Sequence, residues 1–190
     1  MSDHSTTLAW RVDWRQASSL AARLIAFLVE RGIVEAMPTD SGLVRLAHRP
    51  GPNASEAIIS PPQDPSGTKR YGDFRELSTN GVEIEYLVRP RLLAGGDDMF
   101  VFRCPSCDAE HDADEILELI EELDNPFGPE PEAKCPGCAT SSKVSDLRVS
   151  NGAFANLTLC FWNWWPLCDS FLETIGALVG RPPRVLYEKR

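Results

Sequence analysis

The sequence predicts an α+β fold: a two-layer sandwich, ferredoxin-like in outline, with inserted β-hairpins and an inserted module that contains four cysteines. Three observations support this class. Both ends of the chain follow one plan, which is a tryptophan-containing strand, a helix of similar length, a glycine and another strand. Two such units that share one sheet are typical of an α+β sandwich. Between them, hairpin signals and two Cys-x-x-Cys pairs interrupt the plan.

The N-terminal unit begins with a strand and continues into a helix. Residues 7–14 alternate in polarity, which predicts a half-buried strand with one apolar face formed by Leu8, Trp10, Val12 and Trp14. Ser18 or Ser19 is the expected N-cap of the following helix, and Gly32 is the expected residue just after its end. Apolar residues of this helix recur at helical spacing: Leu20, Leu24, Phe27 and Leu28.

The segment that leads to the cysteines predicts short strands and a long loop. Short strands are expected at residues 33–34 and 43–47, and the proline-rich residues 49–72 predict a surface loop. Asn80-Gly81 is a type I′ turn signal, so residues 74–77 and 82–88 are expected to pair as a hairpin. A turn at residues 95–98 then leads into a strand at residues 99–103.

The C-terminal unit repeats the opening plan. Residues 154–165 predict a strand, Pro166 is expected in the first turn of a helix, Gly180 ends that helix, and residues 184–188 form the last strand. The apolar stripe expected for the helix is Leu167, Phe171, Ile175, Leu178 and Val179.

An aromatic cluster closes the strand at residues 154–165. Strand alternation places Trp162 and Trp164 on one face, and Phe161 and Trp165 on the other. These tryptophans are expected either to pack in the core or to form a contact surface for a partner, because tryptophan is enriched at the centres of protein interfaces.

Four cysteines form two pairs, Cys104-Pro105-Ser106-Cys107 and Cys135-Pro136-Gly137-Cys138. Together they supply four thiolates, which complete a tetrahedral zinc shell and leave no position for water. Proline after the first cysteine of each pair suits a tight turn whose N–H groups point at the sulfurs. On these motifs residues 100–145 resemble the zinc-ribbon family, although 27 residues separate Cys107 from Cys135, more than the usual separation of about 15–20. The resemblance implies one structural Zn²⁺ held by Cys104, Cys107, Cys135 and Cys138, and no particular activity.

A redox site is an alternative for the first pair, because Cys104 and Cys107 follow a strand and precede a helix, as in a glutaredoxin-type active site. The helix begins too late to place its N-terminus on Cys104, and a second pair is present, so structural zinc is the prediction. His111 is expected to face solvent rather than bind the metal. Cys160 and Cys168 lie in an apolar run and are expected to be buried free thiols.

The net charge of −9 originates in one segment. Residues 108–132 carry eleven carboxylates and no lysine or arginine, and the other 165 residues hold 17 acids and 19 bases. Asp112 is expected to cap a helix here with an apolar stripe of Ile116, Leu119, Ile120 and Leu123. The acidic face of this helix consists of Glu115, Glu118, Glu121 and Glu122. We expect that face either to stay solvated or to bind a basic partner.

The chain opens without a basic region followed by an apolar stretch, so no secretory signal is expected. Six cysteines without such a signal favour a reducing, cytoplasmic compartment. The longest uncharged run, residues 149–168, contains asparagine and proline and predicts a strand and a helix rather than a membrane span. We expect one α+β body made of residues 1–98 and 146–190, with residues 99–145 inserted as the zinc module.

The sequence contains no nucleotide-binding loop, dinucleotide fingerprint or nucleophile elbow. We therefore expect a non-catalytic zinc-binding cytoplasmic protein that acts through protein–protein contact, as an adaptor or toxin-immunity protein. In its general character the chain resembles small bacterial immunity-type proteins. The candidate contacts are the four glutamates of the acidic face together with Trp162 and Trp164. The alternatives are a zinc-ribbon regulator associated with nucleic acid and a Cys-x-x-Cys thiol redox enzyme. Nucleic acid is disfavoured because eleven carboxylates beside the cysteine pairs repel phosphate.

Overall fold

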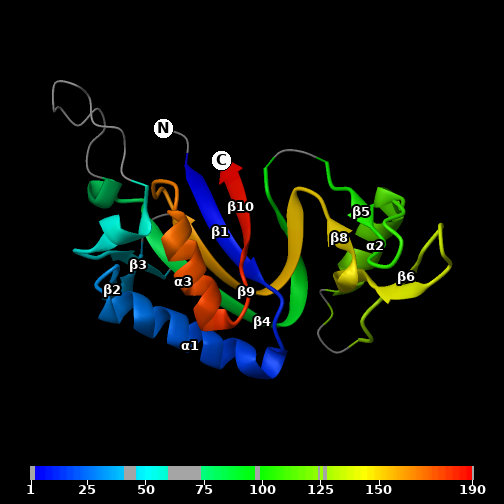
Figure 1. The fold of residues 1–190 in the computed structure, drawn as a ribbon, viewed down its shortest axis with the longest axis horizontal. Coiled ribbons are helices and arrows are strands. Elements are labelled where there is room, and N and C mark those ends of the chain that lie inside the picture. Colours follow the sequence, from blue (N-terminus) through cyan, green and yellow to red (C-terminus); the bar gives the residue numbers. More distant parts are fainter. Residues whose placement is uncertain are drawn as a thin grey trace.

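The computed structural model describes residues 3–40, 46–59, 74–96, 99–123, 125 and 128–189. Its centre is a six-stranded sheet (Figure 1). The strands, in the order in which they lie, are β10 (Arg184–Lys189), β1 (His4–Trp10), β9 (Gly152–Trp162), β4 (Gly81–Ala94), β3 (Ala47–Pro50) and β2 (Val34–Thr39). Every neighbouring pair is antiparallel. The α+β class is therefore confirmed, whereas the ferredoxin-like topology is not.

Two helices cover one face of this sheet: α1 (Trp14–Glu30) and α3 (Asp169–Val179) (Figure 1). The expected helix-ending glycines are confirmed, since Gly32 has φ +66° and Gly180 has φ +89°, a conformation that glycine adopts without a steric penalty. The helix starts differ from the prediction. α1 begins earlier because the Asp13 side chain, not Ser18 or Ser19, caps it by accepting a hydrogen bond from Arg15 N at 3.0 Å.

Both predicted strand–helix junctions were misplaced by a few residues. β1 ends at Trp10, so Trp14 belongs to the helix and is 49% exposed rather than part of the buried strand face. At the other junction α3 begins at Asp169, with Cys168 at the N-cap position, and Pro166 precedes the helix. The apolar stripes themselves are correct in part: Leu20, Leu24 and Leu28 of α1, and Phe171 and Ile175 of α3, are buried.

The main core lies between the two helices and the sheet. Strand β9 shows the alternation most clearly, because Leu157, Leu159 and Phe161 are fully buried against the helices. Thr158, Cys160 and Trp162 occupy the positions between them and therefore point to the opposite face. In this core Leu8 and Trp10 of β1 join the residues of β9.

The hairpin predicted around Asn80-Gly81 is wrong. A type I′ turn needs positive φ at both central residues, and neither Asn80 nor Gly81 has it. Instead, residues Phe74–Glu76 form a short 3-10 helix, η2, and the buried Asn80 side chain donates a hydrogen bond to Phe74 O. This helix places Phe74 against Trp164, with ring centroids 5.3 Å apart, so tertiary packing decides the conformation.

The predicted strands and loop before this point are only partly described. β2 overlaps the strand expected at residues 33–34 only at Val34 and runs on to Thr39. β3 overlaps the strand expected at residues 43–47 only at Ala47 and runs on to Pro50, and residues 43–45 lie outside the described part. Of the loop predicted for residues 49–72, Ala54–Ala57 forms the 3-10 helix η1 with buried alanines. Ile58 forms an isolated bridge with Leu167. Residues 60–73 lie outside the described part.

Strands β4 and β9 bend and carry the chain to a second cluster. Their register shifts between Tyr86 and Arg91, after which Leu92 pairs with Phe154. Beyond this shift lie α2 (Ala113–Leu123), the 3-10 helix η3 (Val144–Asp146) and two small sheets, β5 (Phe102–Arg103) with β8 (Arg148–Val149) and β6 (Glu132–Lys134) with β7 (Ser141–Lys143). The buried residues of this second cluster are Phe102, Ile116, Leu123, Ala133, Val144, Leu147 and Phe154. Of the helices that the structure describes, none is long and apolar enough to cross a membrane.

Candidate metal centre

The two Cys-x-x-Cys pairs form turns of the same geometry. In the first turn Asp108 N donates to Cys104 O at 3.0 Å, and Cys104 N donates to Ala109 O at 2.9 Å. In the second, Ala139 N donates to Cys135 O at 3.0 Å, and Cys135 N donates to Thr140 O at 3.0 Å. The residue after the last cysteine is left-handed in both turns, with φ +64° at Asp108 and +60° at Ala139. The sequence likeness of the pairs thus extends to their backbone.

The second pair is held by a β-hairpin and the first by a strand and a single bridge. β6 enters the second pair and β7 leaves it, and the two strands pair with each other. β5 enters the first pair, and the chain returns beside it through a bridge between Arg103 and Glu110. His111 N donates to Phe102 O at 2.9 Å and extends this return. The two turns approach each other although 27 residues separate them in sequence.

The four sulfur atoms lie within 4.8 Å of one another. Cys104 Sγ is 3.9 Å from Cys138 Sγ, and Cys107 Sγ is 3.5 Å from Cys135 Sγ, so each of these contacts joins one turn to the other. A tetrahedral zinc site with Zn–S bonds of about 2.3 Å requires sulfur separations of about 3.8 Å. The observed separations fit a four-thiolate site for a metal ion such as zinc.

Backbone N–H groups point at the sulfurs, and an arginine side chain holds the first turn. Ser106 N lies 3.4 Å from Cys104 Sγ, and Gly137 N lies 3.3 Å from Cys135 Sγ. Arg148 donates to Pro105 O at 2.9 Å and pairs with Asp108 at 3.3 Å. Four thiolates around one divalent ion carry a net charge of about −2, so the N–H groups at the sulfurs stabilise the charged form.

Close packing between the turns depends on a small residue. A Cβ atom at Gly137 would lie 2.7 Å from the Cβ atom of Ala109, which is too close for a side chain. It would also lie 3.5 Å from Cys107 Sγ. Glycine therefore lets the second turn approach the first to the distance that a shared metal needs.

The hydrogen bonds of the thiols give them different acidities. A side-chain and a backbone hydrogen bond with Thr140 lower the pKa of Cys138 to about 6. At Cys107 a backbone hydrogen bond from Ala109 lowers the pKa, but the thiols of Cys135 and Cys138 outweigh it and raise the pKa to about 12. Thiolates are the form that binds a metal, so the hydrogen bonds with Thr140 favour the metal-binding form of Cys138.

Three further sequence predictions concern residues outside this cluster. His111 was expected to face solvent, but it is only 8% exposed, and it is not one of the grouped ligands. Cys160 and Cys168 are free, as expected, but they are partly rather than fully buried. The hydroxyl of Thr7 lies 3.3 Å from Cys160 Sγ, and burial raises the pKa of Cys160 to about 11.

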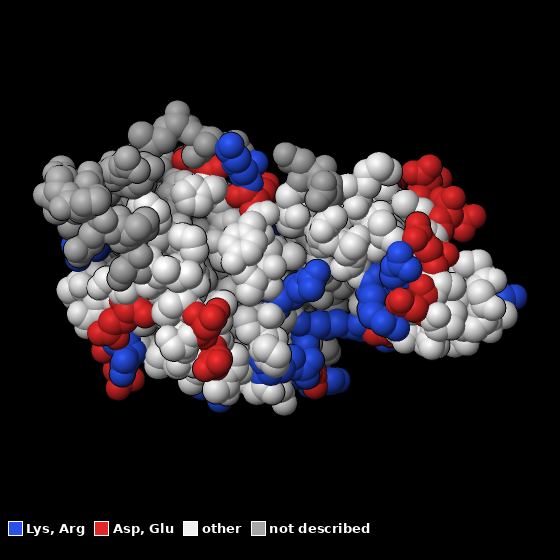
Figure 2. Space-filling view, turned by 45° about the horizontal axis from the view of Figure 1, so that its top comes forward, with Lys and Arg blue, Asp and Glu red and all other residues white. Residues whose placement is uncertain are grey.

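The acidic helix has the predicted position and cap. Asp112 Oδ1 accepts hydrogen bonds from Asp114 N at 3.0 Å and Glu115 N at 3.2 Å. Ile116 and Leu123 of α2 are buried in the second cluster, which supplies the packing partner that so short a helix needs. The four glutamates of the acidic face are exposed, and in the described part of the chain no basic side chain pairs with them: Glu115, Glu118, Glu121 and Glu122. Figure 2 shows acidic residues gathered at the end of the molecule that carries α2.

The tryptophan prediction was wrong about shared faces. Asn163 has φ +57° and interrupts the strand. Its side-chain oxygen accepts a hydrogen bond from His4 N at 3.0 Å, and its side-chain nitrogen donates one to Thr79 Oγ1 at 2.9 Å. Trp164 therefore turns into the main core beside Phe161, with ring centroids 5.2 Å apart, while Trp162 stays on the opposite face. Trp164 is 1% exposed and Trp162 is 6% exposed, which agrees with the core-packing alternative.

Comparison of the chain with models of known families, with curated proteins and with solved structures finds no match. The class that the site itself defines is that of proteins with four clustered cysteines that could hold a metal ion.

Proposed function

We propose that this protein binds one structural Zn²⁺ through Cys104, Cys107, Cys135 and Cys138 and acts without catalysis, by protein–protein contact. The observation that carries the zinc assignment is the cluster of four sulfur atoms within 4.8 Å, presented by two turns of equal geometry. When bound, zinc would join the two turns and add to the stability that the small hydrophobic cluster of this module provides. All four positions of a tetrahedral ion would be filled by protein, so no substrate or water would reach it.

The partner in this proposal is a basic protein. The zinc module would hold α2 in place, and α2 would present the acidic face made of Glu115, Glu118, Glu121 and Glu122. Support comes from the exposure of these side chains and from the lack of a basic counterpart in the described residues around them. An adaptor or toxin-immunity role in the cytoplasm fits such a surface, because localised charge steers a basic partner and suppresses other partners.

The metal is tested by native mass spectrometry and elemental analysis of the purified protein. We expect one zinc per chain. Instead, a thiol in the purified protein that reacts rapidly at neutral pH would favour the Cys-x-x-Cys redox enzyme, and salt-dependent retention on DNA or RNA would favour the nucleic-acid regulator.

The contact surface is tested by changing the four glutamates of the acidic face to glutamine and repeating a pull-down from the native host. Exposed ion pairs contribute about 0.2–1 kcal/mol each, so loss of four should weaken binding of a basic partner roughly 4- to 900-fold. The matched control neutralises four exposed glutamates on other elements: Glu30, Glu35, Glu56 and Glu76. Equal loss in both variants, or a partner whose retention does not depend on salt, would contradict the acidic-face proposal and leave the zinc assignment unaffected.

A further inference from the structure

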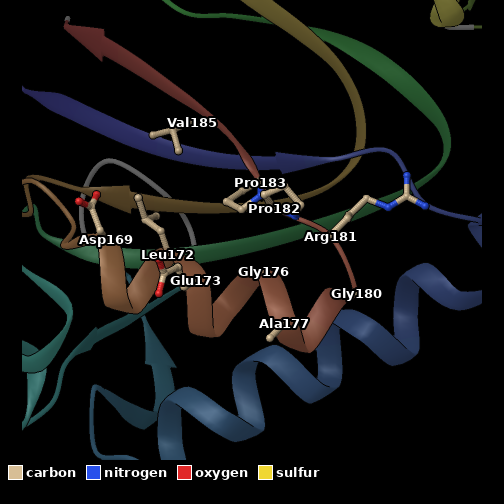
Figure 3. Close-up of a pocket in the computed structure, with 10 residues that line it drawn as sticks. All are labelled: Asp169, Leu172, Glu173, Gly176, Ala177, Gly180, Arg181, Pro182, Pro183 and Val185. Atoms are coloured by element: carbon tan, nitrogen blue, oxygen red, sulfur yellow. The ribbon is translucent and has the colours of Figure 1, made fainter.

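The six-stranded sheet is hollowed on each of its faces. On the helix side an apolar groove of about 690 Å³ runs between α3 and the segment that leads into β10, with Leu172, Pro183 and Val185 in its lining (Figure 3). On the opposite face, which α1 and α3 leave uncovered, a cleft of about 490 Å³ lies between side chains of β1, β9 and β4 and the bent end of β4 (Figure 1). The volume of this cleft is within the range of about 300–1,000 Å³ that is usual for small-molecule sites.

Polar side chains of neighbouring strands form the floor of the cleft. Residues that pair directly across an antiparallel sheet share a face, and Cys160 of β9 pairs with Thr7 of β1 and with Glu83 of β4. Thr158, two residues earlier in β9, pairs with Glu85 on the same face. The floor therefore presents hydroxyl, thiol and carboxyl groups side by side.

The opposite wall of the cleft is apolar and comes from the far end of strand β4. Beyond its register shift this strand bends over the sheet and contributes Leu92, Leu93 and Ala94 to the lining. Arg91, at the start of this wall, forms an ion pair with Glu85 on the floor. A molecule in the cleft would thus meet hydrocarbon on one side and polar groups on the other.

Negative charge is in excess in the cleft. Its lining contains three carboxylates and one arginine: Glu83, Glu85, Glu188 and Arg91. Arg91 pairs with Glu85, whereas Glu83 forms no ion pair with any described residue and accepts a long hydrogen bond of 3.5 Å from Trp162 Nε1. The Cys160 thiol stays neutral at neutral pH because burial raises its pKa. Within the described part of the chain no three of these groups lie close enough to hold a metal ion, so the charge favours an organic cation.

One hydroxyl group on the floor lacks a partner. The Thr158 side chain is 7% exposed, and its Oγ1 atom forms no hydrogen bond with any described residue. Protein atoms do not enclose this oxygen completely, so it opens into the cleft that Thr158 lines. Buried polar groups are almost always hydrogen-bonded, and the unpaired hydroxyl therefore points to a polar ligand group held beside it.

We propose that the cleft binds a short aliphatic diamine. One ammonium group lies at the Glu83 carboxylate, and the second amine donates a hydrogen bond to Thr158 Oγ1. Glu83 and Thr158 are diagonal neighbours in the sheet, a relation that separates side chains by about 7–8 Å, so a short carbon chain fits between the two nitrogen atoms. The methylene groups of that chain pack on Leu92, Leu93 and Ala94 of the opposite wall.

Isothermal titration calorimetry of the full zinc-loaded chain with 1,4-diaminobutane, in reducing buffer at about 0.15 M salt, tests the proposal. We expect one diamine per chain, with a dissociation constant roughly in the submillimolar range, because so small a ligand has few atoms with which to bind. Glu83→Gln should raise this constant at least about tenfold, since it removes the charge but keeps an oxygen that can accept from Trp162. Thr158→Val keeps the shape of the side chain, removes the hydroxyl and should raise the constant about 3- to 10-fold.

Two controls separate the cleft from general attraction between an amine and an acidic protein. The variant in which the four glutamates of the acidic face of α2 are changed to glutamine should bind the diamine as the wild type does. Butane-1,4-diol has the same carbon chain without charge and should bind at least about tenfold more weakly. Zinc content and circular dichroism establish that each variant is folded.

Three results would overturn the proposal and leave the zinc assignment unaffected. The first is a wild type that binds no diamine up to about 10 mM, and the second is a diol that binds as tightly as the diamine. The third is a dissociation constant that neither Glu83→Gln nor Thr158→Val raises more than the acidic-face variant does.

Discussion

Replacing Cys135 by serine gives the most direct test of how zinc would stabilise this chain. Cys135 Sγ lies 3.5 Å from Cys107 Sγ and accepts hydrogen bonds from Gly137 N and Cys138 N, so it is held by both turns. A serine hydroxyl is a poor zinc ligand beside three thiolates. The variant should therefore lose metal affinity while it keeps almost the same side-chain volume.

The size of the effect of Cys135→Ser depends on the lost metal binding rather than on lost packing. Zinc contributes about 10–16 kcal/mol to the folding of zinc-finger peptides at neutral pH. Loss of one of the four ligands removes about one quarter of this, which corresponds to roughly 100- to 1,000-fold weaker zinc binding. Domains are stable by only about 5–15 kcal/mol in total. The second cluster has seven buried residues, so residues 102–149 should unfold when the metal is removed.

Two readouts separate this module from the rest of the chain. All five tryptophans lie outside residues 99–149, and three of them, Trp10, Trp164 and Trp165, lie in or against the main core. Tryptophan fluorescence therefore reports the main sheet, while hydrogen exchange measured by mass spectrometry reports residues 102–149. In a titration with a zinc chelator, Cys135→Ser should release zinc at a lower chelator concentration than the wild type, with exchange protection lost in the module and fluorescence retained.

Cys168→Ser is the matched control, because this thiol lies outside the sulfur cluster and is only partly buried. It should bind zinc as the wild type does. A Cys135→Ser protein that holds no metal yet keeps full exchange protection in residues 102–149 would refute the reasoning, as would a wild-type protein whose module is equally protected with and without zinc.

Three other predictions follow from single residues. Gly137→Ala should weaken zinc binding, measured by chelator competition, because its Cβ atom would meet that of Ala109 at 2.7 Å; unchanged affinity would contradict the close approach. Gly180→Ala should lower the free energy of unfolding by about 1–2 kcal/mol in urea, because φ is +89° and the new Cβ atom meets nothing within 4 Å. Burial raises the pKa of Glu130, but hydrogen bonds from Ser145 and Lys143 outweigh it and lower the pKa. The folded state therefore gains stability from the ionised carboxylate above pH 4.5 and loses it as the pH falls further. Glu130→Gln should destabilise the protein by about 1 kcal/mol at pH 7, and this difference should shrink as the pH falls below 4.5. A pH-independent difference in unfolding would disagree with this assignment.

Features that depend on neighbours in sequence were predictable. The ends of both main helices at Gly32 and Gly180, the cap at Asp112 and the four clustered cysteines were each inferred from a few adjacent residues, and the structure confirms them. Their geometry is local: a left-handed residue, a cap or a turn forms from hydrogen bonds within four or five positions.

Features that depend on residues far apart in the sequence were not predictable. Asn80-Gly81 carries a strong hairpin signal, yet Phe74 packs on Trp164 from ninety residues away and residues Phe74–Glu76 form a helical turn instead. Likewise, the polar partners of Asn163 come from His4 and Thr79, and only their presence explains why Trp164 leaves the strand face that it would share with Trp162.

The sequence by itself thus determined the α+β class, the clustering of the cysteine pairs and the acidic helix, because periodicity, capping and ligand spacing are properties of short segments. Only the tertiary structure decided the strand order, the cross-turn approach of Cys104 to Cys138 and of Cys107 to Cys135, and the groove beside α3. These features arise where segments far apart in the chain meet. Burial and hydrogen bonding between such segments outweigh local preferences of about 1 kcal/mol per residue.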